Sequence, residues 1–192
     1  MIRRLYDWTL SMAAHPHALW ALAVVAFIES SVFPIPPDIL MIPMIIANPT
    51  RAWLIALVAT VSSVLGGVAG YAIGALVFDG IGQPVLEFYG KADSVAEFNA
   101  RFNEWGAWAV LIAGITPFPY KVITIMSGWT GLSLPVFIVS SIVARGFRFF
   151  VLAALLWKFG LPIRGFIDRY LGLLFTAFVV LLLAGFYAIQ YL

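Results

Sequence analysis

Long runs of apolar residues dominate the chain and predict helices that cross a membrane. A spanning helix needs about 20 mostly apolar residues. The stretches 52–77 and 171–192 reach this length without a charged residue, and 132–157 reaches it with Arg145 and Arg148 inside. These three stretches are therefore predicted to be transmembrane helices.

Two further apolar stretches, 17–46 and 105–128, are interrupted by prolines. Proline lacks a backbone N–H and clashes with the preceding turn, so a cluster of prolines ends a helix. Inside a bilayer, a broken backbone is tolerated only where protein or water satisfies it. Each stretch is therefore predicted to be a re-entrant hairpin of two half-helices, with a kinked spanning helix as the alternative. The prolines expected at the hairpin tips are Pro34, Pro36 and Pro37 in the first stretch, and Pro117 and Pro119 in the second.

The two halves of the chain resemble each other. The segment 34–38, Pro-Ile-Pro-Pro-Asp, is similar to 117–121, Pro-Phe-Pro-Tyr-Lys. Further along, 62–65 (Ser-Ser-Val-Leu) is similar to 140–143 (Ser-Ser-Ile-Val). Each half is therefore predicted to contain one hairpin followed by one spanning helix.

The basic residues predict how these halves cross the membrane, because positive residues favour the cytoplasmic side. The first half should begin on the cytoplasmic side and cross to the outer side at 52–77. The second half should enter the membrane from the outer side and cross back to the cytoplasmic side at 132–157. Two similar halves of opposite orientation form an inverted repeat, which is typical of transporters that bind their substrate near the midplane. The basic residues are Arg3, Arg4 and Arg51 around the first half, and Lys158, Arg164 and Arg169 between the last two spans.

Composition supports the same class. Of the 192 residues, 63% are hydrophobic and 10% are charged, whereas soluble domains average about 45–50% apolar and about 25% charged residues. This excludes a soluble enzyme, a disordered tail and a nucleic-acid module, and indicates an all-α integral membrane protein. We expect one membrane domain, 1–192, made of an interfacial helix (1–16), a first repeat (17–78), a polar connector with a short amphipathic helix (79–104), a second repeat (105–157), and a basic loop with a C-terminal transmembrane helix (158–192).

Five charged residues lie inside the apolar stretches: Glu29, Asp38, Lys121, Arg145 and Arg148. Even on a mild insertion scale, one such residue at the bilayer centre costs about 2.5–3.5 kcal/mol. These side chains must therefore pair, reach water or lie near an interface. Two acids against three bases leave one positive charge, which suits an anionic headgroup. The alternative is that the acids only neutralise the bases inside a sealed bundle.

The chemistry of these five side chains predicts separate roles. Arg145 and Arg148 are three residues apart, so they share a helix face and can aim two guanidinium groups at one phosphate or carboxylate. Lys121 would add a point charge, and these three residues are the predicted substrate-binding set. Glu29 and Asp38 are predicted to gate the site or carry protons, because burial and a nearby arginine act on a carboxylate's protonation in opposite directions.

Other motifs narrow the function. Gly66, Gly70 and Gly74 have the small-xxx-small spacing that permits close helix contact; access for a ligand is the alternative use of these glycines. There is no phosphate-binding lysine loop, no catalytic triad and no zinc-binding His-Glu-x-x-His motif. We therefore predict no enzymatic activity, no cofactor and no metal.

These residues and their order resemble the DedA family of membrane proteins, which share a region called the VTT or SNARE-associated domain. Residues 29–38 (Glu-Ser-Ser-Val-Phe-Pro-Ile-Pro-Pro-Asp) and the glycine-rich 66–74 resemble its first half. Residues 116–121 (Thr-Pro-Phe-Pro-Tyr-Lys) and 145–150 (Arg-Gly-Phe-Arg-Phe-Phe) resemble its second half. The short YqaA-like branch is the most similar. The resemblance implies paired re-entrant hairpins in an inverted repeat, and movement of lipids between leaflets.

The resemblance also bears on single residues. It implies that acids at Glu29 and Asp38 are required for function, and that Lys121 stands where relatives usually have arginine. Many relatives carry an earlier arginine just before the second proline tract, where this chain has Ile115 and Thr116. An arginine from the next helix could supply that charge.

We therefore expect a transporter or flippase that moves an anionic lipid phosphate across a bacterial inner membrane, with proton coupling as an option. The expected partner is undecaprenyl phosphate or a phospholipid, and no nucleic-acid partner is expected. The sequence leaves open whether the protein forms a homo-oligomer. Two other classes also stay open. One is a structural or assembly factor for membrane integrity, whose charges only hold the bundle together. The other is a lipid-phosphate-modifying enzyme, against which the lack of catalytic histidines argues.

Overall fold

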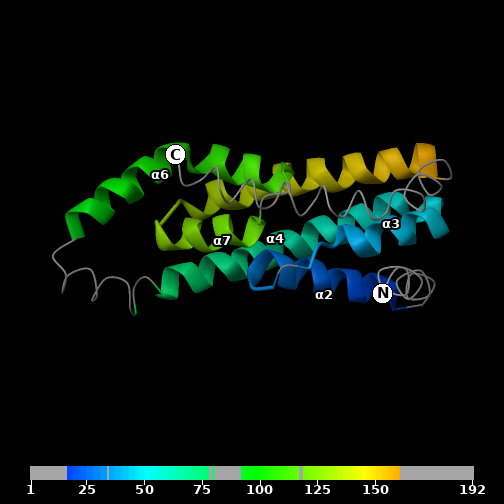
Figure 1. Cartoon of the computed structure of the whole chain (residues 1–192), viewed down its shortest axis with the longest axis horizontal. Coiled ribbons are helices and arrows are strands. Elements are labelled where there is room, and N and C mark those ends of the chain that lie inside the picture. The colour runs from blue at the N-terminus through cyan, green and yellow to red at the C-terminus, as the bar shows by residue number, and fades with distance from the viewer. Residues whose placement is uncertain (1–16, 34, 78–79, 81–91, 117–118, 161–192) are drawn as a thin grey trace, which may run out of the picture.

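Every regular element that the structure describes is a helix (Figure 1). The structure is a computed structural model, and it describes residues 17–33, 35–77, 80, 92–116 and 119–160. The predicted interfacial helix at 1–16 and the predicted spanning helix at 171–192 lie outside the described residues, as do Pro34 and Pro117.

The first half contains α2 (Ala18–Ser31), α3 (Asp38–Ala47) and α4 (Ala52–Val77), with the short 3-10 helix η1 (Pro49–Arg51) before α4. α2 ends before the first proline tract, and α3 begins directly after Pro37. The fixed φ of proline suits the start of a helix, where a backbone donor is not needed. The chain reverses between the two helices, so α2 and α3 form a hairpin.

The second half contains α6 (Ala92–Ile115), α7 (Tyr120–Trp129) and the long helix Leu134–Gly160. α7 begins directly after Pro119, so the second proline tract also separates two helices. α6 is one continuous helix, which joins the short amphipathic helix expected in the connector to the first limb of the second hairpin.

Corresponding helices of the two halves run in opposite directions (Figure 1). α2 and α4 run one way along the long axis and α3 returns, whereas α6 and the Leu134–Gly160 helix run the way of α3 and α7 returns. As a result, α4 and the Leu134–Gly160 helix lie antiparallel.

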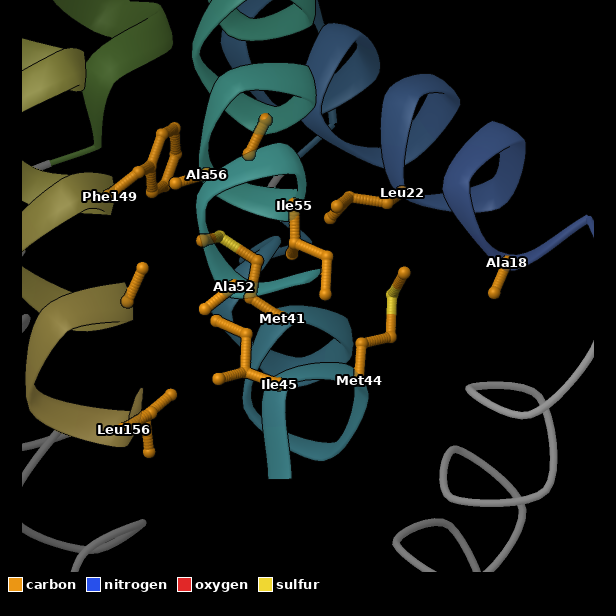
Figure 2. Packing of buried hydrophobic residues seen from close by; sticks show 12 residues of the cluster. Ala18, Leu22, Met41, Met44, Ile45, Ala52, Ile55, Ala56, Phe149 and Leu156 are labelled. Carbon is orange, nitrogen blue, oxygen red and sulfur yellow. The ribbon is translucent and has the colours of Figure 1, made fainter. Parts of the chain in front are cut away.

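Two apolar clusters hold the helices together. Figure 2 shows the first cluster, in which Leu22, Met41, Ile55 and Phe149 join α2, α3, the start of α4 and the second half of the Leu134–Gly160 helix. The second cluster joins α6, α7 and the start of the Leu134–Gly160 helix, and consists of Val110, Ala113, Tyr120, Ile123, Leu132 and Phe137. Along both long helices, the stretch between the two clusters carries buried polar residues.

Glycines let α4 approach its neighbours at the level of the backbone. A Cβ atom on Gly66 would overlap the carbonyl of Phe27 in α2, and one on Gly74 would overlap the carbonyl of Ile125 in α7. Gly128 in α7 faces α4 in the same way. The glycines of α4 therefore provide the close helix contact that their spacing predicts.

Among the described residues, two helices are long and apolar enough to cross a membrane, Pro49–Val77 and Leu134–Gly160. They coincide with the spans predicted at 52–77 and 132–157. Their outward faces carry exposed large apolar side chains, for example Leu65 on the first helix. Contiguous apolar surface of this kind is typical of contact with lipid or a partner, because water would favour polar side chains there.

Candidate functional site: two ion pairs and a lysine at the hairpin tips

Four of the five charged residues predicted to lie in the apolar region form two ion pairs. Arg145 Nη2 lies 2.7 Å from Glu29 Oε2, and Arg148 Nη2 lies 2.6 Å from Asp38 Oδ2. Glu29 is near the end of α2 and Asp38 begins α3, so successive turns of the Leu134–Gly160 helix hold both limbs of the first hairpin. The three-residue spacing of the arginines makes this double contact possible.

The Arg145 side chain is closed off on every side. Only 2% of it is exposed, and its Nε donates to Ser63 Oγ at 2.6 Å. Its guanidinium carbon lies 4.8 Å from the centre of the Tyr120 ring and 4.6 Å from that of Phe149. Cations stack favourably on aromatic faces, and the effect grows when water is excluded. A buried arginine with these partners leaves no open face for a ligand.

Hydroxyl groups complete the surroundings of this pair. Ser30 Oγ donates to Glu29 Oε2 at 3.0 Å and lies 2.7 Å from Ser63 Oγ. The Tyr120 hydroxyl donates to Ser141 Oγ. The roles of Ser30, Ser63, Tyr120 and Ser141 were not predicted from the sequence. The available signal was the repeated serine pair, of which Ser63 and Ser141 are the second members.

Arg148 is more open, and it contacts one residue next to each proline tract. Its side chain is 22% exposed and that of Asp38 is 21% exposed. Its Nη1 donates to the backbone carbonyl of Thr116 at 2.9 Å. One arginine therefore links the start of α3 to the residue that directly follows α6.

Lys121 has no carboxylate within ion-pair distance among the described residues. Its Nζ donates to the carbonyl of Val32 at 3.2 Å, at the C-terminal end of α2, where a positive charge is favourable. Thr124, one turn further along α7, donates to the carbonyl of Ser30 at 3.0 Å. The two hairpins therefore meet through polar contacts, and the excess positive charge of the five residues resides on Lys121.

These features define an α-helical membrane protein with a charged site inside its helix bundle. Residues 35–158 match the VTT domain family. The chain belongs to this family, the DedA family that its sequence resembles. The match includes Asp38, Lys121, Arg145 and Arg148, and it begins shortly after Glu29.

Relatives of the chain occur in several bacteria. An uncharacterized protein of Haemophilus influenzae is 36% identical over 151 residues, which cover 79% of this chain and 78% of that protein. A homologue in Histophilus somni matches to the same extent. An uncharacterized membrane protein of Mycobacterium leprae is 24% identical over 114 residues, 59% of this chain and 47% of that protein. No solved structure matches the chain.

Proposed function

We propose that this protein moves lipids with an anionic phosphate headgroup between the two leaflets of a bacterial inner membrane. The observation that carries the proposal is Lys121, which has no carboxylate partner in the described part of the chain and lies where the two hairpins meet. Phosphate is the anionic group that phospholipids and polyprenyl phosphates have in common. Lysine and arginine are the side chains that bind phosphate.

The arrangement of the helices supports a re-entrant architecture for this task. α3 and α7 each contain 10 residues, and a helix of this length rises about 15 Å, half the hydrocarbon thickness of about 30 Å. We infer that the pairs α2–α3 and α6–α7 enter the membrane from opposite faces and meet near its middle. The opposite directions of corresponding helices in Figure 1 support this inverted repeat.

Aromatic residues indicate how deep in the membrane the charged site would lie. Trp53 and Trp157 lie together at one end of the long helices, with ring centres 6.1 Å apart, and both are exposed. Tryptophan prefers the membrane interface. From Trp53 to Ser63 the helix rises about 15 Å, so an interface at Trp53 would put the Arg145 pair near the bilayer centre. Arg51 and Lys158 lie near the same tryptophans, which favours the cytoplasmic side for this end.

The five charged residues take unequal parts in this proposal. Lys121 and Arg148 would contact the headgroup, because they are the more accessible cations. The sequence also predicted Arg145 as a headgroup ligand. Its enclosure by Glu29, Ser63 and two rings favours a different role, that of holding the first hairpin against the Leu134–Gly160 helix. Glu29 and Asp38 would control access to the site.

A flipping assay with the purified chain in liposomes tests the proposal. Lys121→Gln should abolish movement of a fluorescent anionic phospholipid, whereas Lys121→Arg should retain it. Lys158→Gln is the matched control, because it removes the same charge from an exposed side chain that stacks on Phe159. Flipping by Lys121→Gln at the wild-type rate would contradict the proposal.

The two ion pairs favour one other candidate, an assembly factor whose charges only hold the bundle together. In that case Lys121→Gln should still support membrane integrity in cells that lack the wild-type protein. Only variants that break an ion pair should impair membrane integrity. The same set of variants therefore separates the two functions.

A further inference from the structure

The two ion pairs hold their carboxylates with different strength. Glu29 Oε2 receives two hydrogen bonds, from Arg145 and from Ser30, and its arginine is 2% exposed. Within the described ranges, Asp38 receives one side-chain hydrogen bond, from an arginine that is 22% exposed. Asp38 is therefore the carboxylate that can leave its partner at lower cost.

The position of Asp38 at the start of α3 also stabilises its negative charge independently of Arg148. Asp38 is the first residue of this helix, and no side chain caps the helix start. The backbone N–H groups of Ile39 and Leu40 already donate to the carbonyls of Pro36 and Pro37, but the aligned peptide dipoles still favour a negative charge at the start of a helix. A carboxylate released from Arg148 would thus remain stabilised at the N-terminus of α3.

Arg148 carries one positive charge, which Asp38 already neutralises. Its Nη1 donates to the carbonyl of Thr116, and its Nη2 donates to Asp38. A guanidinium has five N–H donors, but a phosphate that binds the remaining ones would lie beside the like charge of Asp38. The phosphate therefore has to compete with Asp38 for Arg148. Lys121 has no such competitor among the described side chains.

From this asymmetry we propose that Asp38 is an exchangeable internal counter-ion, which a phosphate group displaces from Arg148 when it binds between Arg148 and Lys121. The proposal rests on the proposed function and adds a determinant of specificity. A phosphate monoester carries about 1.5 to 2 negative charges at neutral pH, whereas a phosphodiester carries one. The monoester therefore displaces a carboxylate more readily. A lipid headgroup and free phosphate share this chemistry.

Binding measurements on the purified full chain in a neutral detergent test the proposal without requiring transport. The probes are dioctanoyl phosphatidic acid (a monoester), dioctanoyl phosphatidylglycerol (a diester) and inorganic phosphate. We expect phosphatidic acid to bind more tightly than phosphatidylglycerol. Binding of inorganic phosphate with the same dependence on the variants would identify the phosphate group alone as the ligand. Binding restricted to phosphatidic acid would identify a lipid.

The Asp38 variants give the decisive comparison. Asp38→Asn removes the competitor and should tighten phosphatidic acid binding about five- to tenfold, the effect of losing a moderately strong ion pair. Asp38→Glu keeps the charge and should stay within about twofold of wild type. Glu97→Gln removes an acid from an exposed pair with Arg101 on α6 and should change nothing. Asp38→Ser, whose hydroxyl suits a helix start, is a second neutral variant if Asp38→Asn does not fold.

A double variant separates displacement from general electrostatics. The gain from Asp38→Asn should disappear when Arg148→Gln is added, because the released donor is then absent. A gain that persists without Arg148, or neutral Asp38 variants that bind no more tightly than wild type, would overturn this inference alone. If the wild-type chain binds neither phospholipid nor phosphate, the proposed function fails as well.

Discussion

Replacing Glu29 by glutamine should destabilise the protein more than any other single change of charge among the described residues. The substitution keeps the shape of the side chain, and its amide oxygen can still accept a hydrogen bond from Arg145. It removes the counter-charge of a guanidinium that is 2% exposed. Breaking a buried ion pair by removing one partner costs about 3–5 kcal/mol. This is a large part of the stability of about 5–15 kcal/mol that is typical of a folded protein.

The surroundings of Arg145 bear on where in this range the cost should fall. The rings of Tyr120 and Phe149 still face the guanidinium in the variant, and such contacts contribute about 0.5–2 kcal/mol. Ser63 still accepts from Nε. Because these contacts remain, the loss should fall at the lower end of the range. Because none of these groups is negatively charged, they do not replace Glu29, and we still expect a loss of about 3 kcal/mol.

Unfolding of the purified protein in mixed micelles, followed by tryptophan fluorescence, measures this loss. The double variant Glu29→Gln with Arg145→Gln should recover much of the stability, since removing both charges leaves no buried ion. Glu97→Gln is the control, because the exposed pair with Arg101 should contribute less than about 0.5 kcal/mol. A loss below about 1 kcal/mol for Glu29→Gln, or a double variant no more stable than the single one, would refute the reasoning.

Three further predictions concern packing, the site and topology. Gly66→Ala should destabilise the protein by at least about 1–3 kcal/mol in the same assay, because its Cβ would overlap the backbone of α2; Gly146→Ala, which meets only an ordinary contact, should not. Lys121→Gln should change stability by less than about 0.5 kcal/mol while abolishing flipping, and loss of both together would indicate a structural role. The chain has no cysteine, so Arg51→Cys and Glu97→Cys should react with an impermeant maleimide from opposite sides of the membrane; labelling from one side would contradict the topology.

Local properties of the sequence predicted the elements that depend on local forces. The spans at 52–77 and 132–157 follow from apolar length alone, and both proline tracts end one helix and begin another as expected. The connector was expected to contain a short amphipathic helix, and α6 is helical from Ala92 onward. The continuity of α6 into the second half was not predicted, because polar composition does not distinguish one long helix from a short helix followed by a loop.

The sequence by itself determined the class of protein, its family, and a set of five charged residues with one excess positive charge. Only the tertiary structure decided which acid meets which base. Glu29 and Arg145 are 116 residues apart in the chain, and their meeting depends on how closely α2 packs against α4 at Gly66. The same packing encloses Arg145 with rings and hydroxyls, and it leaves Lys121 without an acidic partner among the residues that the structure describes. Pairing over such distances is a property of the whole helix bundle, because each contact exists only when the others position its partners.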